Sequence, residues 1–495
     1  MLKPSRFLKD FASTAATSIA AACSLVIVTR LLAHGLGQEA FGIYSLSKRI
    51  LATLMPFSML GMNVAITRHI AISTDGATKY LFLVSGFILA VMPSVVLFLV
   101  GMVFISQLSA IVFQSANYSL VILAVLFTLM GYSCYVVMFA LYMGTGKTWK
   151  ANLWQLALFA LWPIIVAGVY AKSGAVHLIL FFTGIPYFLT VVPLGVCLWK
   201  GIPYFRQTIS VADPLKQLLR YSLPRVPGGF VLASMLTLGP FLASYFGSLT
   251  DAGYFVVGQS VFALTEAGIS AFGLVVLPKA AQLYADGRLE FLRERISDVV
   301  ALTVHLGLFV TIQFYIWADQ LILVWLGHQY SNAIPLMRIL LFGLLPHFLY
   351  VLLRSVIDAV DEKAINTYNL YVSMLVAMLS SLFFVFVGLG LRGLAVGTVL
   401  GFLTRGLATV RYLWRGRWFT VEGCHFKACL LLNAGILTLA FLFKSIITRF
   451  YPPTLTLLVS ALLFESVLFG LYYLILRRLG VGWVRAFEQR VTRVE

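Results

Sequence analysis

The sequence is short of charge, and above all of negative charge. Only 11% of its 495 residues are charged, against roughly a quarter in soluble globular proteins, and 61% are hydrophobic. Asp and Glu number 18 against 36 Lys and Arg, which gives a net charge of +18. A soluble core with a polar surface is thereby excluded. The basic excess does not indicate nucleic acid, because the cations lie in short connections and form no basic face on a folded domain.

Cysteines and enzyme motifs are also scarce. The five cysteines form no CxxC pair, so we expect them to be small apolar packing residues, and Cys424, His425 and Cys429 make only a weak metal pattern. The chain has no GxxxxGK[ST] loop, no GxGxxG after a strand and no HExxH. We therefore expect no cofactor, no metal, no nucleic-acid partner and no enzymatic activity.

Long apolar segments are what the chain has instead. Each covers about 20 residues, enough to cross a membrane as a helix, whereas a β-barrel would show alternating segments of about ten. The predicted fold class is an all-α polytopic membrane protein with about 14 transmembrane helices. The segments lie at 12–33, 41–67, 80–105, 118–143, 151–171, 176–199, 217–246, 252–278, 299–326, 332–357, 364–388, 393–414, 428–448 and 454–476.

Loop charges indicate how these segments are oriented. With the N-terminus inside, the inside segments hold 25 Lys and Arg and the outside segments hold 4. Because cytoplasmic loops collect Lys and Arg, this alternation predicts that both termini are cytoplasmic. The stretch 286–298, DGRLEFLRERISD, is charged and amphipathic, and we expect it to form a surface helix.

A weak internal repeat relates the two halves. The polar turn at 34–40 leads into Gly42, and a similar pattern surrounds Gly253, which lies 211 residues later. Six helices per repeat would give the two lobes the same orientation, related by an axis along the membrane normal. The predicted parts are an N-terminal lobe at 1–200, a C-terminal lobe at 201–415, and two further helices with a basic tail at 416–495.

Besides the 29 Lys and Arg counted with the loops, seven cations fall inside the predicted segments. An ionisable side chain at mid-membrane costs at least about 2.5 kcal/mol, so each must meet a partner, face a wet cavity, or reach the interface with its long side chain. We expect Arg405 to reach the interface. Arg30 and Arg338 lie near outer ends, where reaching the interface and facing an outer vestibule are equally open.

Three cations are better candidates for a cavity. Arg49 stands on a polar stripe with Thr53, so it is the stronger lining candidate, and Lys48 stands at the margin. Arg225 lies between Pro224 and Pro227, where we predict a kink, so it either reaches the interface or carries charge into a cavity at a hinge. The predicted substrate-binding residues are Arg49, Arg225, Lys48, Arg30 and Arg338.

Acids within the predicted segments are fewer. Glu266 shares a face with Gln259 and Ser270, and we expect an ion pair with a cavity arginine, with binding of a coupling cation or proton transfer as alternatives. Glu465 is expected to make an inter-helix hydrogen bond.

Three short stretches carry a family resemblance. The turn LGQEAFGIYSL at 36–46, GMNVAITRHIA at 61–71 and LTDAGYFVVGQSV at 249–261 resemble bacterial Wzx-type polysaccharide flippases of the multidrug/oligosaccharidyl-lipid/polysaccharide (MOP) exporter superfamily. The resemblance implies movement of an undecaprenyl-pyrophosphate-linked oligosaccharide to the outer leaflet of the inner membrane, by alternating access, for polysaccharide or lipopolysaccharide biosynthesis. It also implies a cationic central cavity for the head group.

The implied partners are the lipid-linked oligosaccharide, membrane lipids, and a polysaccharide polymerase or other assembly protein. Three alternatives stay open. The first is an ion-coupled multidrug exporter of the same superfamily, which would need acids in its cavity. The second is a lipid II-type flippase, which fourteen segments also suit. The third is a membrane scaffold for polysaccharide assembly, which would need no cavity charge.

Overall fold

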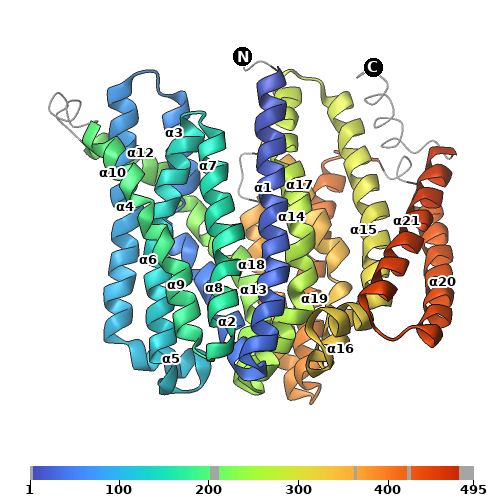
Figure 1. Ribbon diagram of the computed structural model, residues 1–495. Coiled ribbons are helices and arrows are strands. Elements are labelled where there is room, and N and C mark those ends of the chain that lie inside the picture. Colours follow the sequence, from blue (N-terminus) through green and yellow to red (C-terminus); the bar gives the residue numbers. More distant parts are fainter. Residues whose placement is uncertain (1–3, 201–210, 362–364, 421–424, 479–495) are drawn as a thin grey trace. The chain divides into compact units, whose positions relative to one another are not determined.

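The computed structural model describes residues 4–200, 211–361, 365–420 and 425–478, and these residues are helical throughout apart from short connections (Figure 1). Within these residues, eleven helices are each long and apolar enough to cross a membrane, and 13 segments qualify if two bent helix pairs each count as one. The predicted all-α membrane fold is confirmed. The chain divides into two compact units, 1–256 and 257–495, which we call unit 1 and unit 2.

Among the described residues, unit 1 contains twelve α-helices and the start of α14. Their bounds are α1 (Pro4–Leu36), α2 (Gln38–Met59), α3 (Met62–Ile72), α4 (Gly76–Val103), α5 (Ile105–Phe113), α6 (Ser119–Gly144), α7 (Thr148–Gln155), α8 (Trp162–Tyr170), α9 (Val176–Leu189), α10 (Val191–Lys200), α12 (Ala212–Ser222) and α13 (Val226–Phe246), with short helical segments η1 (Ala116–Tyr118), η2 (Leu156–Leu161), η3 (Ala171–Ser173) and η4 (Leu223–Arg225).

Unit 2 contains the remaining helices. The long α14 (Leu249–Ala285) begins in unit 1 and continues into unit 2. It is followed by α15 (Leu289–Leu326), η5 (His328–Tyr330), α16 (Ala333–Leu341), α17 (Leu344–Val360), α18 (Ile365–Phe386), α19 (Gly390–Arg415), α20 (Phe426–Phe450) and α21 (Leu455–Arg478).

Each of the fourteen predicted segments overlaps one helix or a run of consecutive helical elements. The segment 41–67 is α2 and α3, bent by 43° at a break where Leu60 and Gly61 both have positive φ. The segment 332–357 is α16 and α17, bent by 49°. A span can bend in this way without ending, provided that the backbone N–H and C=O groups that lose their helical hydrogen bonds at the break are buried in protein.

Two predicted connections differ from the structure. The turn expected over 34–40 is reduced to Gly37, whose φ of 79° only glycine adopts readily, since α1 continues to Leu36 and α2 begins at Gln38. The surface helix expected at 286–298 is not separate: after a turn at Gly287, its residues form the first turns of α15. Charged residues therefore extend a membrane helix beyond its apolar part.

Departures from regular α-helix occur where the sequence supplies a reason. At Pro224 the helix changes to a 3-10 turn, η4, between α12 and α13, as the two prolines predict. The segment η2 is π-helical, and α1 packs against it. There the buried hydroxyl of Ser24 donates a hydrogen bond of 2.7 Å to the carbonyl of Ala160.

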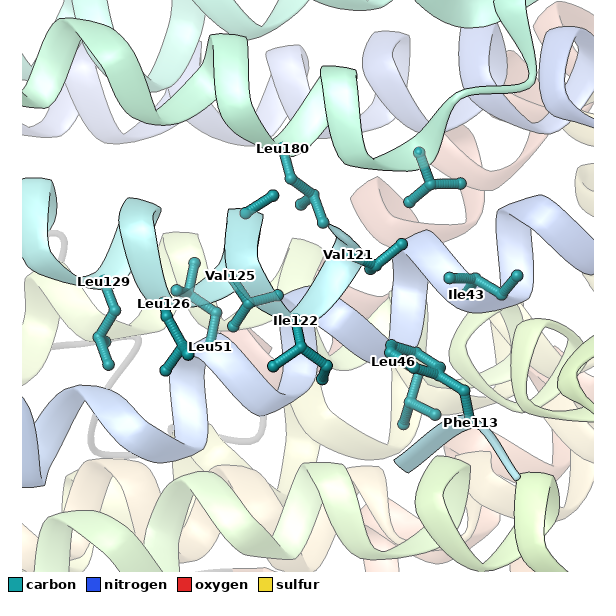
Figure 2. Packing of buried hydrophobic residues seen from close by; sticks show 12 residues of the cluster. Ile43, Leu46, Leu51, Phe113, Val121, Ile122, Val125, Leu126, Leu129 and Leu180 are labelled. Carbon is teal, nitrogen blue, oxygen red and sulfur yellow. The ribbon is translucent and has the colours of Figure 1, made fainter. Parts of the chain in front are cut away.

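The core of unit 1 lies where α2, α6 and α9 meet, as Figure 2 shows. Leu46 and Leu129 are fully buried, and Ile43, Ile122 and Leu180 fill the space between the three helices. Membrane helices gain little hydrophobic free energy from meeting one another, so close packing and small residues have to hold them together.

Two glycines that the repeat relates to one another are in direct contact. Gly42 of α2 packs so closely on α14 that a methyl group on it would lie 1.9 Å from the carbonyl oxygen of Leu249. A methyl group on Gly253 would lie 3.2 Å from the Cα of Gly42. Both glycines lie within helices. They let the two helix backbones touch, as small residues do at membrane helix interfaces. The lobes defined by the repeat stay a prediction.

We expect Gly42→Ala to destabilise unit 1 by about 1–3 kcal/mol, because the added methyl group would force α2 and α14 apart. Gly168→Ala in α8 is the matched control, since nothing lies within 4 Å of a methyl group there. Thermal unfolding of the purified protein, followed by loss of the monodisperse size-exclusion peak, measures both. Equal stability of the two variants would contradict this close contact.

Candidate functional site

The strongest predicted site residues lie on α2. Lys48 and Arg49 occupy the middle of this helix and are half-buried. The carbonyl of Arg49 accepts hydrogen bonds from the hydroxyls of Thr53, at 3.0 Å, and of Thr237 on α13, at 3.2 Å. The two hydroxyls also lie 2.7 Å apart. The predicted polar stripe therefore contacts α13 at Thr53, and this contact fixes the backbone that carries the two cations.

No carboxylate shares the middle of a span with these cations in the described part of unit 1. The acidic residues there, Asp10, Glu39, Asp75, Asp213 and Asp251, stand in the first two turns of their helices or cap them. Several are held locally: Asp75 accepts hydrogen bonds from the backbone N–H and hydroxyl of Thr78, which keep the pKa of its carboxyl below the ordinary value. The span interiors of unit 1 thus carry positive charge only.

Arg225 belongs to a different part of unit 1. It ends η4, and it lines an open pocket of about 350 Å³ together with residues of α3 and α12. The pocket is lined by Arg68, His69, Gln217, Arg220, Tyr221 and Arg225. The three arginines carry positive charge, and no acidic residue is among the lining residues. We call this pocket the arginine pocket.

Tyr221 stands at the centre of the arginine pocket. The guanidinium carbon of Arg225 lies 4.0 Å from the centre of the Tyr221 ring, and that of Arg68 lies 4.5 Å from it. Arg225 also donates a hydrogen bond to the backbone carbonyl of Tyr221, and the His69 ring packs edge-on against Tyr221 at 5.7 Å. Cation–π contacts of this kind hold two like charges beside one ring.

Glu266 lies in unit 2 at the end of a chain of polar side chains that crosses three helices. Its carboxylate is 3.8 Å from Nε2 of His347 on α17. Nδ1 of His347 is 2.6 Å from the guanidinium of Arg405 on α19. Because a guanidinium can only donate, Nδ1 must accept, and the neutral ring carries its proton on Nε2, facing Glu266. Glu266 and Arg405 thus both lie against His347, and the predicted pairing of Glu266 with an arginine stays a prediction.

The expectation that Arg405 reaches the interface is wrong. Its side chain is 1% exposed, and its guanidinium lies 4.4 Å from the centre of the Tyr350 ring and 4.9 Å from that of Phe402. The aromatic rings and His347 together replace the solvation that the interface would have given.

Other unit 2 charges are also matched. Asp319 on α15 lies 2.5 Å from the ammonium of Lys444 on α20 and 3.6 Å from the guanidinium of Arg338 on α16. Arg338 is therefore ion-paired, in addition to being partly exposed. Glu465 accepts a hydrogen bond of 2.9 Å from the indole of Trp317, which confirms the predicted inter-helix bond.

The five predicted site cations therefore have different local surroundings. Lys48 and Arg49 are adjacent on α2, Arg225 lies in the arginine pocket, Arg338 pairs with Asp319, and Arg30 is exposed on α1. Sequence reasoning missed the roles of Arg68, Arg220, Tyr221, His347 and Arg405. Arg68 and Arg220 belong to the cations that the loop-charge pattern assigns to the inside connections. The other residues were missed because no local sequence pattern connects residues on different helices. Among the described residues, no cluster of His, Cys, Asp or Glu could hold a metal ion.

Comparison with known proteins identifies the fold. No family model matches the chain, and no curated protein matches it by sequence. Solved structures do match, and they show that the chain has the fold of membrane transporters of the MOP superfamily.

Three of these structures illustrate the likeness. The lipid II flippase MurJ, in an inward closed conformation, is 14% identical with a TM-score of 0.67 and covers 95% of this chain and 99% of its own. An inward-facing multidrug resistance MATE family transporter is 16% identical with a TM-score of 0.61, covering 81% and 94%. A MOP superfamily transporter from Pyrococcus furiosus, described as having a binding pocket of reverse polarity, is 17% identical with a TM-score of 0.59, covering 83% and 95%.

We expect Arg405→Met to destabilise unit 2 by about 1.5–3 kcal/mol, because Nδ1 of His347 would lose its donor inside the protein. Arg411→Met on the same helix, at an exposed position, is the control and should leave stability unchanged. Thermal unfolding in detergent measures both variants. Similar losses for both would show that Arg405 has no special structural role.

Proposed function

We propose that this protein is a flippase that moves a polyprenyl-diphosphate-linked oligosaccharide from the cytoplasmic to the outer leaflet of the bacterial inner membrane. One observation carries the proposal: Lys48 and Arg49 stand in mid-helix in a unit whose described span interiors hold no carboxylate. Positive charge held in this way suits an anionic substrate that enters the protein and leaves again.

The chemistry of the substrate fits these two residues. A diphosphate offers several acceptor oxygens, and the planar guanidinium of Arg49 can bind two of them at once, while Lys48 adds a compact charge. The polyprenyl chain would stay in the lipid, and the protein would shield only the polar head group. The two threonines that hold the Arg49 carbonyl keep the binding residues on a fixed backbone.

The likeness to a lipid II flippase over 95% of this chain supports a lipid-linked substrate and alternating access. The absence of enzyme motifs supports a transporter. The loop charges support cytoplasmic termini. The sugar and the Wzx-type subfamily stay predictions from the sequence resemblance, and so do a polymerase or assembly partner.

A multidrug exporter of the same superfamily is the second candidate. The observation that favours it is Glu266, whose side chain is 35% exposed and could meet a cation or a proton. Against it, Asp319 and Glu465 already have partners, and Glu266 faces His347. Cationic drugs would also be repelled by Lys48 and Arg49.

We expect wild-type protein in proteoliposomes to move a fluorescent polyprenyl-diphospho-sugar between leaflets, and Arg49→Ala to slow this movement about tenfold or more, because a charge-assisted bidentate contact is lost. Lys48→Ala should slow it less, and Arg49→Lys should keep part of the rate. Dithionite quenching of the outer-leaflet label gives the rate.

Lys172→Ala, at an exposed cation of unit 1 in η3, is the control and should match wild type. If Arg49→Ala and Lys48→Ala both move the lipid at the wild-type rate, the assignment of Lys48 and Arg49 to the substrate site is wrong. If wild-type protein does not move the lipid but does transport a fluorescent cation, the flippase proposal is wrong and the multidrug exporter takes its place.

A further inference from the structure

The arginine pocket lies where unit 1 leaves the hydrocarbon. The continuous segment from Ala212 to Phe246 has 35 residues, about 52 Å as a helix, whereas the hydrocarbon is about 30 Å thick. The 21 residues of α13 suffice for that thickness, so α12 and η4 extend into the headgroup layer.

The composition of α12 agrees with this placement. Pro214 and Leu218 are buried against the unit, and Asp213, Lys216 and Arg220 are exposed. The helix lies against α3 and α4 (Figure 1). A helix with one apolar face and one charged face is stable at the surface of a membrane. The arginine pocket therefore opens at the depth at which lipid phosphates lie.

We propose that the arginine pocket binds the phosphate ester of a membrane lipid. Three guanidinium groups line a space of about 350 Å³ that has no acidic lining residue, and a phosphate fits such a set of forked donors. Two lipids share this chemistry: an anionic phospholipid of the bilayer, and the diphosphate of a polyprenyl lipid. The pocket is separate from Lys48 and Arg49.

Tyr221 is the positioning residue of the pocket. The guanidinium carbons of Arg68 and Arg225 lie 4.5 Å and 4.0 Å from the centre of its ring, so this one ring holds both cations beside the pocket. Arg225 uses one donor on the carbonyl of Tyr221, which leaves others for a ligand. Gln217 adds an amide that can donate to a phosphate oxygen or accept from a sugar or glycerol hydroxyl.

This inference does not depend on transport, because binding is measured without any movement between leaflets. The full-length protein in neutral detergent micelles is titrated with dioleoyl phosphatidylglycerol or with farnesyl diphosphate. Dioleoyl phosphatidylcholine and farnesol are the headgroup controls. Native mass spectrometry counts the bound molecules and gives a dissociation constant for each.

We expect wild type to bind one molecule of an anionic lipid that the double variant Arg68→Ala with Arg225→Ala binds about tenfold more weakly or not at all. Tyr221→Leu should weaken binding while keeping all three charges. Arg288→Ala is the matched control, since this exposed arginine also lies against a ring, 5.1 Å from the centre of Phe291, but outside the pocket.

If the double alanine variant fails to fold, Arg68→Lys with Arg225→Lys keeps the charges and loses the planar forks, and it should still bind more weakly than wild type. Binding of phosphatidylglycerol identifies a bilayer lipid, and binding of farnesyl diphosphate alone identifies a diphosphate lipid. Equal binding by wild type and by the pocket variants, or equal loss in Arg288→Ala, would overturn the proposal.

Discussion

A charged side chain in hydrocarbon needs a partner, and this requirement explains where the two units place their charges. In unit 2, Asp319 lies between Lys444 and Arg338, and the buried Arg405 meets His347 and two aromatic rings. The described span interiors of unit 1 carry Lys48 and Arg49 and contain no Asp or Glu. Among the described residues, acids therefore accompany cations inside the spans of unit 2, whereas the span interiors of unit 1 contain cations and no Asp or Glu.

The cation-bearing helix α2 is held along its whole length by small or polar contacts. Gly42 touches the backbone of α14, Thr53 bonds with Thr237, and Pro56 packs near Gly229 of α13. Close backbone contacts leave little freedom for a helix to slide. The position of Lys48 and Arg49 therefore depends on residues that carry no charge themselves. These contacts hold the backbone of Lys48 and Arg49 in place through uncharged neighbours.

The helices were predictable because the thickness of the hydrocarbon sets a minimum length for every membrane-spanning helix. Each apolar run of about 20 residues corresponds to one helix or to consecutive helical elements. The 3-10 turn at Pro224 was also predictable from the local sequence, because proline lacks the backbone N–H that a regular helix needs. Partners between distant residues were not predictable. Arg405 looked like a residue that reaches the interface, because its sequence neighbours do not reveal His347 on another helix. The arginine pocket was hidden similarly, since Arg68 and Arg220 lie 152 positions apart in sequence and only folding brings them together.

The π-helical segment η2 has a consequence for the ancestry of this chain. A π turn holds about one residue more than an α turn, so the part of the span that follows Leu161 is set one residue later than a regular helix would place it. Removing one residue between Leu156 and Leu161 would restore a regular helix, and it would also withdraw the Ala160 carbonyl from Ser24. A related chain without this bulge would align here only across a single-residue gap. A hydroxyl at the position of Ser24 would then lack the acceptor that the Ala160 carbonyl provides in this chain.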